Sequence, residues 1–158
     1  MGADGAEELN DPQKDVPFVS DYLSYLLAHA SHLVSTEFHA HLRRYGIPVP
    51  TWRMLATLSD GDGRTVGELA RIGLYNQPTA TKIMDRLQEE GLAERRRSAD
   101  DRRKTLVFIT AKGRTLVDAL LRDAKRHEQR VLTGYTDEEV AVLKRVLRTL
   151  ITRLDVPG

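Results

Sequence analysis

The chain has 158 residues, of which 41% are apolar and none is cysteine, and its formal net charge is +1. This size allows one domain or two small ones and is short for a multi-domain enzyme. The lack of cysteine excludes disulfides, thiolate metal sites and a cysteine-based redox switch. Because no apolar run approaches the roughly 20 residues of a membrane span and no signal layout opens the chain, we expect a cytoplasmic protein.

The small net charge averages two unlike regions. Residues 1–21 carry a net charge of −5, and the remainder carries +6. Residues 1–16 are rich in Gly, Asp, Glu and Pro, so they cannot bury enough surface to offset the entropy of ordering. We therefore expect a flexible acidic tail over residues 1–16.

Two helices are predicted after this tail. An apolar periodicity over 18–45, bounded by Pro17 and Gly46, predicts one long helix. A second helix follows Pro48 and ends at the turn signal of residues 60–63.

The next two elements have the spacing of a helix-turn-helix. Thr65 and Glu68 form a capping-box pair that opens a short helix over residues 66–72. After a turn containing glycine, a second helix begins at about Gln77 and is closed by Gly91. Two short helices joined in this way define the motif.

A charged hairpin is predicted directly after the motif. Residues 92–97 and 104–110 read as two strands, with residues 98–103 as the tip. Residues 95–104 hold six basic and two acidic side chains, a net charge of +4. Such a cluster is typical of a phosphate-binding surface, and a solvated charged hairpin is the alternative.

Two more helices end the chain. A long helix runs from about residue 110 to 132, and a capping box of Thr136 and Glu139 starts the last one. The last helix has an apolar seam: Val140, Leu143, Leu147, Leu150 and Leu154. The terminal helices either pack within the monomer as a bundle or form a dimer. We favour the dimer, because helix-turn-helix proteins usually bind two half-sites about one DNA turn apart.

The predicted fold is mainly α, an α+β winged helix whose N- and C-terminal helices form a dimerisation region. We expect this helical dimerisation region to comprise residues 17–46 and 111–158. The winged helix-turn-helix DNA-binding region would comprise residues 47–110.

This order of elements resembles the multiple antibiotic resistance regulator (MarR) family of transcription factors over residues 18–154. The most specific piece is similar to the family's pattern of Asp, any residue, Arg, then a Leu-Thr-x-x-Gly close, with Ile where Leu is usual. It consists of Asp101-Arg102-Arg103, Leu106, Ile109-Thr110 and Gly113. Residues 65–70 and 84–92 also resemble the family's helix-turn-helix. The resemblance implies a triangular homodimer whose repression a small ligand relieves.

The second helix of the motif is expected to read DNA. Its outward side chains would be Gln77, Thr79, Ala80 and Lys82. Gln77 suits adenine, and Lys82 suits guanine or a phosphate. Phosphate contacts are expected from Thr65, Thr81 and Arg86.

On the wing, the resemblance implies that Arg103 is a minor-groove arginine and that Asp101 orients it by a charge-assisted contact. The alternative is that both residues only brace the hairpin. Affinity for the DNA backbone is expected from the other basic residues of the cluster: Arg95, Arg96, Arg97, Arg102 and Lys104.

The resemblance also implies a ligand pocket between the dimer helices and the winged helix. Candidate ligand-binding residues are Tyr25, His29, His32, Trp52 and Arg53. Aromatic rings with a cation suit an aromatic carboxylate or a phenolic compound. Alternatively, the aromatic residues belong to the core and the histidines to the helix surface.

No cofactor, metal or catalytic residue is expected. The pairs of His29 with His32 and of His39 with His41, and His127 beside Glu128, suggest a metal site. However, no thiolate is available, and His39 and His41 point to different sides of a helix. We find no phosphate loop, nucleophile elbow or zinc-protease motif, so the protein is not expected to be an enzyme.

The leading hypothesis is a sequence-specific transcriptional regulator. It would be a homodimeric repressor that a small ligand releases from a palindromic operator in double-stranded DNA. The alternative is a nonspecific architectural DNA-binding protein or a protein-interaction winged helix, which would need neither the base-facing residues nor the wing arginine.

Overall fold

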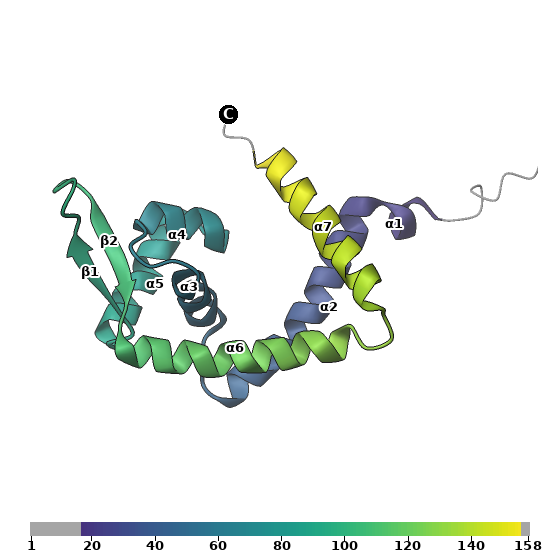
Figure 1. The fold of residues 1–158 in the computed structure, drawn as a ribbon, viewed down its shortest axis with the longest axis horizontal. Coiled ribbons are helices and arrows are strands. Elements are labelled where there is room, and N and C mark those ends of the chain that lie inside the picture. The colour runs from purple at the N-terminus through teal and green to yellow at the C-terminus, as the bar shows by residue number, and fades with distance from the viewer. Residues whose placement is uncertain (1–16, 156–158) are drawn as a thin grey trace, which may run out of the picture. The chain divides into compact units, whose positions relative to one another are not determined.

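The computed structural model describes residues 17–155, and the predicted acidic tail lies outside them. The described elements are labelled in Figure 1. They are α1 Phe18–Asp21, α2 Leu23–Arg44, α3 Val49–Ser59, α4 Val66–Gly73, α5 Gln77–Glu89, β1 Ala93–Arg97, β2 Thr105–Ile109, α6 Ala111–Val131 and α7 Asp137–Leu154. None of these helices is long and apolar enough to cross a bilayer. The chain divides into two compact units at Glu37 and Phe38.

The first unit corrects one prediction, because residues 18–45 do not form a single helix. Tyr22 has an extended backbone (φ −73°, ψ 120°) that separates α1 from α2. Both the backbone N–H and the hydroxyl of Ser20 donate to the Pro17 carbonyl, at 2.9 and 2.8 Å. These local bonds compete with the regular helical pattern. The rings of Phe18 and Tyr22 also stack across the break, with centroids 5.0 Å apart.

One core joins α3, α4, α5, the hairpin and α6 in the second unit. Its fully buried side chains include Met54, Leu55, Leu58, Leu69, Met84, Leu87, Val107 and Val117. A second cluster joins Phe38 and Leu42 of α2 to Leu120 of α6, and Trp52 packs against both clusters. Each such side chain contributes about 1.5–3 kcal/mol on burial. The helix-turn-helix and the hairpin are therefore built on one packed body.

The caps of the helix-turn-helix are formed by side chains. Thr65 Oγ1 accepts from the Glu68 backbone N–H at 3.2 Å, and Glu68 Oε2 accepts from the Thr65 N–H at 2.7 Å, which confirms the predicted capping box. At the start of α5, Asn76 Oδ1 accepts from the Thr79 N–H at 2.8 Å. Each of these caps satisfies a helix N–H that has no partner within the helix.

The hairpin is anchored to the loop that follows α3. Strands β1 and β2 pair antiparallel and end within one residue of the predicted bounds. The Val107 N–H donates to the Arg64 carbonyl at 2.8 Å, and the Gly63 N–H donates to the Val107 carbonyl at 2.9 Å. The Asp62 carboxylate accepts from the Ile109 N–H at 2.8 Å. These bonds fix the inner end of the hairpin to the helical core.

The first turn of α6 requires glycine at position 113. A Cβ at Gly113 would lie 2.0 Å from the carbonyl oxygen of Leu92. Thr110 caps α6 by accepting from the Gly113 N–H at 3.0 Å, and its hydroxyl donates to the Gly91 carbonyl at 2.7 Å. The last residue of the predicted motif is thus explained by a close approach of two backbones.

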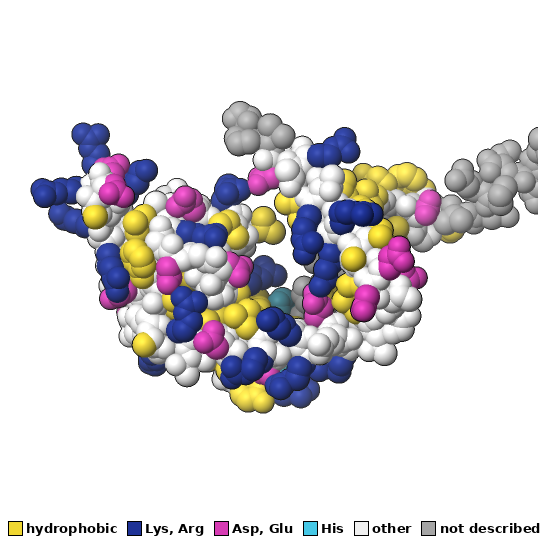
Figure 2. Space-filling model, in the orientation of Figure 1, with side chains coloured by type: hydrophobic (Ala, Val, Ile, Leu, Met, Phe, Trp, Pro, Cys, Tyr) yellow, Lys and Arg dark blue, Asp and Glu magenta, His cyan; other side chains and the backbone are white. Residues whose placement is uncertain are grey.

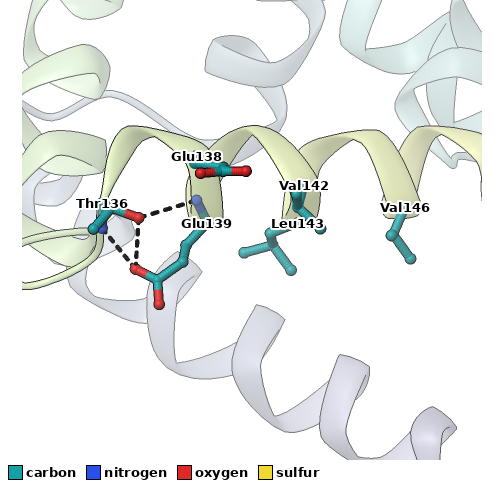
Figure 3. Close-up of a pocket in the computed structure, with 6 residues that line it drawn as sticks. All are labelled: Thr136, Glu138, Glu139, Val142, Leu143 and Val146. Carbon is teal, nitrogen blue, oxygen red and sulfur yellow. Dashed lines mark hydrogen bonds between the residues drawn. The ribbon is translucent and has the colours of Figure 1, made fainter.

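Helix α7 starts with the predicted capping box of Thr136 and Glu139, drawn in Figure 3. No side chain of α7 is buried. Leu143 is 50% exposed and Leu154 is 79% exposed. An open groove of about 630 Å³ runs along this helix and is lined by Thr136, Glu138, Glu139, Val142, Leu143 and Val146. Of the apolar seam predicted from the sequence, Leu143 and Leu154 are exposed and the other three residues are half-buried, while Val142, Val146 and Ile151 add exposed apolar surface to the same helix.

Candidate nucleic-acid interface

Helix α5 has exposed polar side chains in its first two turns. Gln77, Thr79 and Lys82 are exposed, as expected of side chains that face away from the core. Ala80 is 0% exposed, so the expectation that it faces outward is wrong. It packs with Met84, four residues later on the same helical face, in the core of the unit.

Two further α5 candidates have polar partners within the protein. The hydroxyl of Thr81 donates to the Gln77 carbonyl at 2.9 Å. Arg86 Nε lies 2.8 Å from Glu90 Oε1. In this i,i+4 ion pair both side chains are exposed to solvent. Such exposed pairs are weak, so Arg86 keeps its ability to turn towards another anion.

Thr65 lies at the N-terminus of α4, where its hydroxyl is hydrogen-bonded to the Glu68 carboxylate. Thr65 Oγ1 donates to Glu68 Oε2 at 2.7 Å. Hydrogen bonds from the backbone and side chain of Thr65, with smaller contributions from the charges of Lys104 and Arg64, lower the pKa of Glu68. A carboxylate thus already lies at this helix N-terminus, where a phosphate was expected to bind.

The tip of the hairpin is held by its own backbone and by two side chains. Ser98 Oγ accepts from the Asp101 N–H at 3.3 Å, and the Ser98 N–H donates to the Lys104 carbonyl at 2.9 Å. Asp101 Oδ1 accepts from the backbone N–H of Arg103 at 3.0 Å. The expected contact between Asp101 and the Arg103 guanidinium is not the one observed. Asp101 instead fixes the backbone from which the Arg103 side chain projects.

Basic side chains gather at this tip, as the dark blue atoms at the end of the hairpin in Figure 2 show. Arg97, Arg102, Arg103 and Lys104 are all exposed. Within residues 17–155, the first three of these form no ion pair, which leaves their charges available to an external anion. Neighbouring charges of one sign raise the affinity of such a surface for phosphates.

Arg95 and Arg96 have internal partners, unlike the tip residues. Arg95 Nη2 lies 2.7 Å from Asp85 Oδ1, and Arg95 Nη1 donates to Gln88 Oε1 at 3.2 Å. Arg96 pairs with Glu94 and lies over the ring of Phe108, 4.7 Å from its centroid. Sequence analysis placed both arginines on the DNA-facing surface and did not identify Asp85 or Gln88, although their i,i+3 spacing puts them on one side of α5.

The ligand-binding candidates are distributed over the two units. Tyr25, His29 and His32 lie exposed on the part of α2 in the first unit, where the Tyr25 and His29 rings are 5.4 Å apart. In the second unit Trp52 is half-buried, with its ring edge-on to Phe38 at 5.3 Å, and Arg53 is exposed. The contact with Phe38 makes Trp52 part of the packing of this unit.

A polar contact that the sequence did not reveal joins α2 to α6. His41 Nε2 lies 2.8 Å from Asp123 Oδ2, and Arg126 pairs with the same carboxylate. The hydrogen bond with His41, followed by the contacts with Arg126, lowers the pKa of Asp123. Over residues 17–155, no group of three or more His, Asp or Glu side chains is placed to hold a metal ion.

Comparison with known proteins agrees with this geometry. A profile described as the MarR family matches residues 45–104. A MarR family transcriptional regulator from Silicibacter pomeroyi DSS-3 has a solved structure that matches with a TM-score of 0.78 and 41% identity, over 89% of this chain and 100% of that chain.

Two similar proteins are repressors. The HTH-type transcriptional repressor IacR of Pseudomonas putida is 27% identical over 146 residues, which cover 92% of this chain and 87% of the relative. The transcriptional repressor CouR, solved with a 23-mer DNA duplex, matches with a TM-score of 0.73 and 27% identity, over 84% of this chain and 94% of that chain. The winged helix and these matches together show that the chain belongs to the MarR family, whose members are DNA-binding transcriptional regulators and not enzymes.

Proposed function

We propose that this protein is a homodimeric repressor that binds a palindromic operator in double-stranded DNA. The observation that carries the proposal is the pairing of two surfaces on one packed body. The exposed side chains of Gln77, Thr79 and Lys82 lie at the start of α5, and the basic tip of the hairpin belongs to the same unit. A helix that enters the major groove and a wing that enters the minor groove need this combination.

Base recognition is assigned to the start of α5. Gln77 can hydrogen-bond to adenine, while Lys82 can donate to guanine or to a phosphate, and a good base contact contributes about 1–3 kcal/mol of discrimination. Thr79 would also face the base edges, whereas Thr81 and Arg86 would bind the DNA backbone and set the register. We assign the same role to Thr65. It would act through its place in the cap of α4, because its hydroxyl is already hydrogen-bonded to Glu68.

The wing is assigned to the neighbouring minor groove. Arg103 would insert there, because a narrow groove at an A·T tract has an enhanced negative potential. Arg97, Arg102 and Lys104 would contact phosphates on either side. Asp101 would support this arrangement by fixing the Arg103 backbone N–H.

Dimerisation is assigned to the terminal helices, residues 17–46 and 111–158. The uncovered apolar side chains of α7 support this, since an exposed seam of this kind usually marks an interface. Two copies would present two copies of α5 to successive half-sites of a palindrome.

The test is a binding titration of the purified protein with its own promoter-region DNA and with a scrambled duplex of the same length and salt concentration. The repressor proposal expects the promoter duplex to bind at least about 100-fold more tightly, because specific sites exceed nonspecific DNA by roughly 10³ or more. Equal affinity for both duplexes would favour the alternative of an architectural or protein-interaction winged helix.

We propose a small aromatic carboxylate or phenolic compound as the effector. The ligand-binding residues would be Tyr25, His29, His32, Trp52 and Arg53, because rings can stack on the ligand while Arg53 pairs with its carboxylate. Benzoate and hydroxycinnamate series are suitable probes. If no member changes either the melting temperature or the affinity for the promoter duplex, this effector class is wrong.

A further inference from the structure

Arg95 connects the wing to helix α5. Its side chain reaches from β1 to two residues of the helix, Asp85 at 2.7 Å and Gln88 at 3.2 Å. The Arg95 side chain is only 25% exposed, while that of Asp85 is 53% exposed. The planar guanidinium binds both oxygens at once, so this contact restrains direction as well as distance.

Other arginines of the same strand show that this arrangement is particular to Arg95. Arg97 lies two residues further along β1, on the same face of the strand, and is exposed without an ion pair in the described part of the chain. Arg96 lies on the other face and contacts Glu94 and Phe108. Arg95 is therefore the residue of the basic run whose charge is directed to α5.

Arg95 lies far enough from the tip of the hairpin that a small tilt at this contact would displace the tip. Arg95 is opposite the fully buried Val107 in the sheet register. Asp101 follows six residues later, up to about 20 Å away at a rise of about 3.3 Å per residue. Over such a distance, a tilt of about 5° moves the tip by up to about 1.7 Å, which is enough to break a hydrogen bond.

We propose that Arg95 is a positioning residue, not a DNA contact: with Asp85 and Gln88 it sets the angle of the wing to α5, so that both reach adjacent grooves together. This inference rests on the proposed operator-binding function. It assigns Asp85, an acidic residue on the DNA-reading helix, a role that favours DNA binding.

The decisive variant is Asp85→Asn, because two explanations predict opposite signs. Removing a carboxylate from a DNA-facing helix reduces repulsion of phosphates, so electrostatics alone predicts tighter binding. Loss of the positioning contact predicts weaker binding of the promoter duplex, by about five- to tenfold. Glu89→Gln is the matched control, since it removes an exposed carboxylate from the same helix and should bind with unchanged or slightly greater affinity.

Two Arg95 variants complete the experiment. Arg95→Gln should weaken binding as much as Asp85→Asn, and the double variant should be no weaker than either single one, because both break the same contact. Arg95→Lys keeps the charge and the fold but cannot form the fork, so it should also bind more weakly. In the Arg95→Gln background, Arg103→Ala should cost less affinity than in the wild type, because the wing is already displaced.

The outcomes separate this inference from the proposed function. If the wild type does not distinguish promoter from scrambled DNA, the proposed function fails. If the wild type does distinguish them but Asp85→Asn binds equally or more tightly, the positioning role is wrong. Additive effects of Arg95→Gln and Asp85→Asn, or an undiminished effect of Arg103→Ala, would also overturn it. Melting temperatures within a few degrees of the wild type would show that the variants are folded.

Discussion

Individual side chains decide how the hairpin tip is presented. The Asp101 carboxylate binds a backbone N–H and leaves the Arg103 guanidinium unrestrained by it. Because the backbone of such an arginine is already fixed, its exposed guanidinium can enter a groove at a low entropic cost. The fixed backbone of the turn, which depends on Asp101, and the free guanidinium of Arg103 are thus separate contributions from two nearby residues.

Arg103→Ala is expected to lower affinity for the promoter duplex by about tenfold or more, since a good groove contact contributes about 1–3 kcal/mol. Fluorescence anisotropy with promoter and scrambled duplexes at the same salt measures the change. Lys125→Ala is the control, because it removes an exposed charge from α6, away from the wing. An unchanged affinity for Arg103→Ala would remove the wing arginine from the mechanism.

Gly113→Ala is expected to destabilise the fold by about 3 kcal/mol, because the new Cβ would overlap the Leu92 carbonyl oxygen at 2.0 Å. Thermal or urea unfolding measures it. Gly67→Ala is the contrasting control. This glycine lies inside α4, and the atom nearest to its new Cβ would be Thr65 Oγ1, 4.0 Å away. There, the better helix propensity of alanine should raise stability by about 0.5–1 kcal/mol. Equal effects of the two substitutions would contradict the close-approach explanation.

The contact of His41 with Asp123 predicts a pH-dependent contribution to stability. The His41 hydrogen bond, then Arg126, holds the pKa of Asp123 below its usual value. An acid whose folded-state pKa is lowered stabilises the protein above its unfolded pKa and loses this contribution as the pH falls through the folded value. Wild type should therefore melt above Asp123→Asn near pH 7. The difference should shrink below about pH 4, where a free aspartate begins to protonate. A constant difference from pH 7 to pH 3 would refute this role.

At the scale of elements, caps decide where the reading helix begins. Asn76 starts α5 through its contact with the Thr79 N–H, and Gln77 follows immediately. The cap therefore fixes the backbone from which the proposed base-reading side chain of Gln77 projects. Local side-chain chemistry of this kind links helix stability to DNA binding.

Asn76→Ala should cost about 1 kcal/mol of stability through loss of this cap, whereas Asn76→Ser should largely preserve it. We also expect weaker promoter binding for the alanine variant, because the first turn of α5 would fray. Urea unfolding and anisotropy titrations measure the two effects. Equal behaviour of the serine and alanine variants would show that the cap does not matter.

At the scale of the whole molecule, α7 has the apolar surface of an interface but no buried side chain. Its exposed residues Leu143 and Val146 are among the lining residues of the groove that Figure 3 draws. A single chain with such a seam has surface that a second copy can bury. Oligomeric state and DNA affinity should therefore change together.

Leu143→Glu is expected to weaken the proposed dimer by placing a charge in the apolar surface that a second copy would bury. Sedimentation or light scattering at micromolar concentration should show monomers, and promoter affinity should fall because the two half-sites are no longer bound together. Thr152→Glu adds the same charge on the opposite side of α7 and should remain dimeric. A dimeric Leu143→Glu protein with normal affinity would exclude this face from the interface.

The sequence by itself determined the features that depend on neighbouring residues. The capping boxes at Thr65 and Thr136 and the two strands of the wing follow from local hydrogen bonds and residue pattern. These interactions act over a few residues, so their spacing is visible in the chain. The mainly α winged-helix fold was predicted from the order of these elements and the MarR family from a resemblance of sequence motifs, and both predictions are confirmed.

Only the tertiary structure decided which side chains are buried by other elements or paired with their residues. Ala80 is buried, and Arg95 binds Asp85 rather than facing outward. His41 meets Asp123, which lies 82 positions away along the chain. Burial and ion pairing depend on how elements separated in sequence pack together, and no local spacing encodes that arrangement.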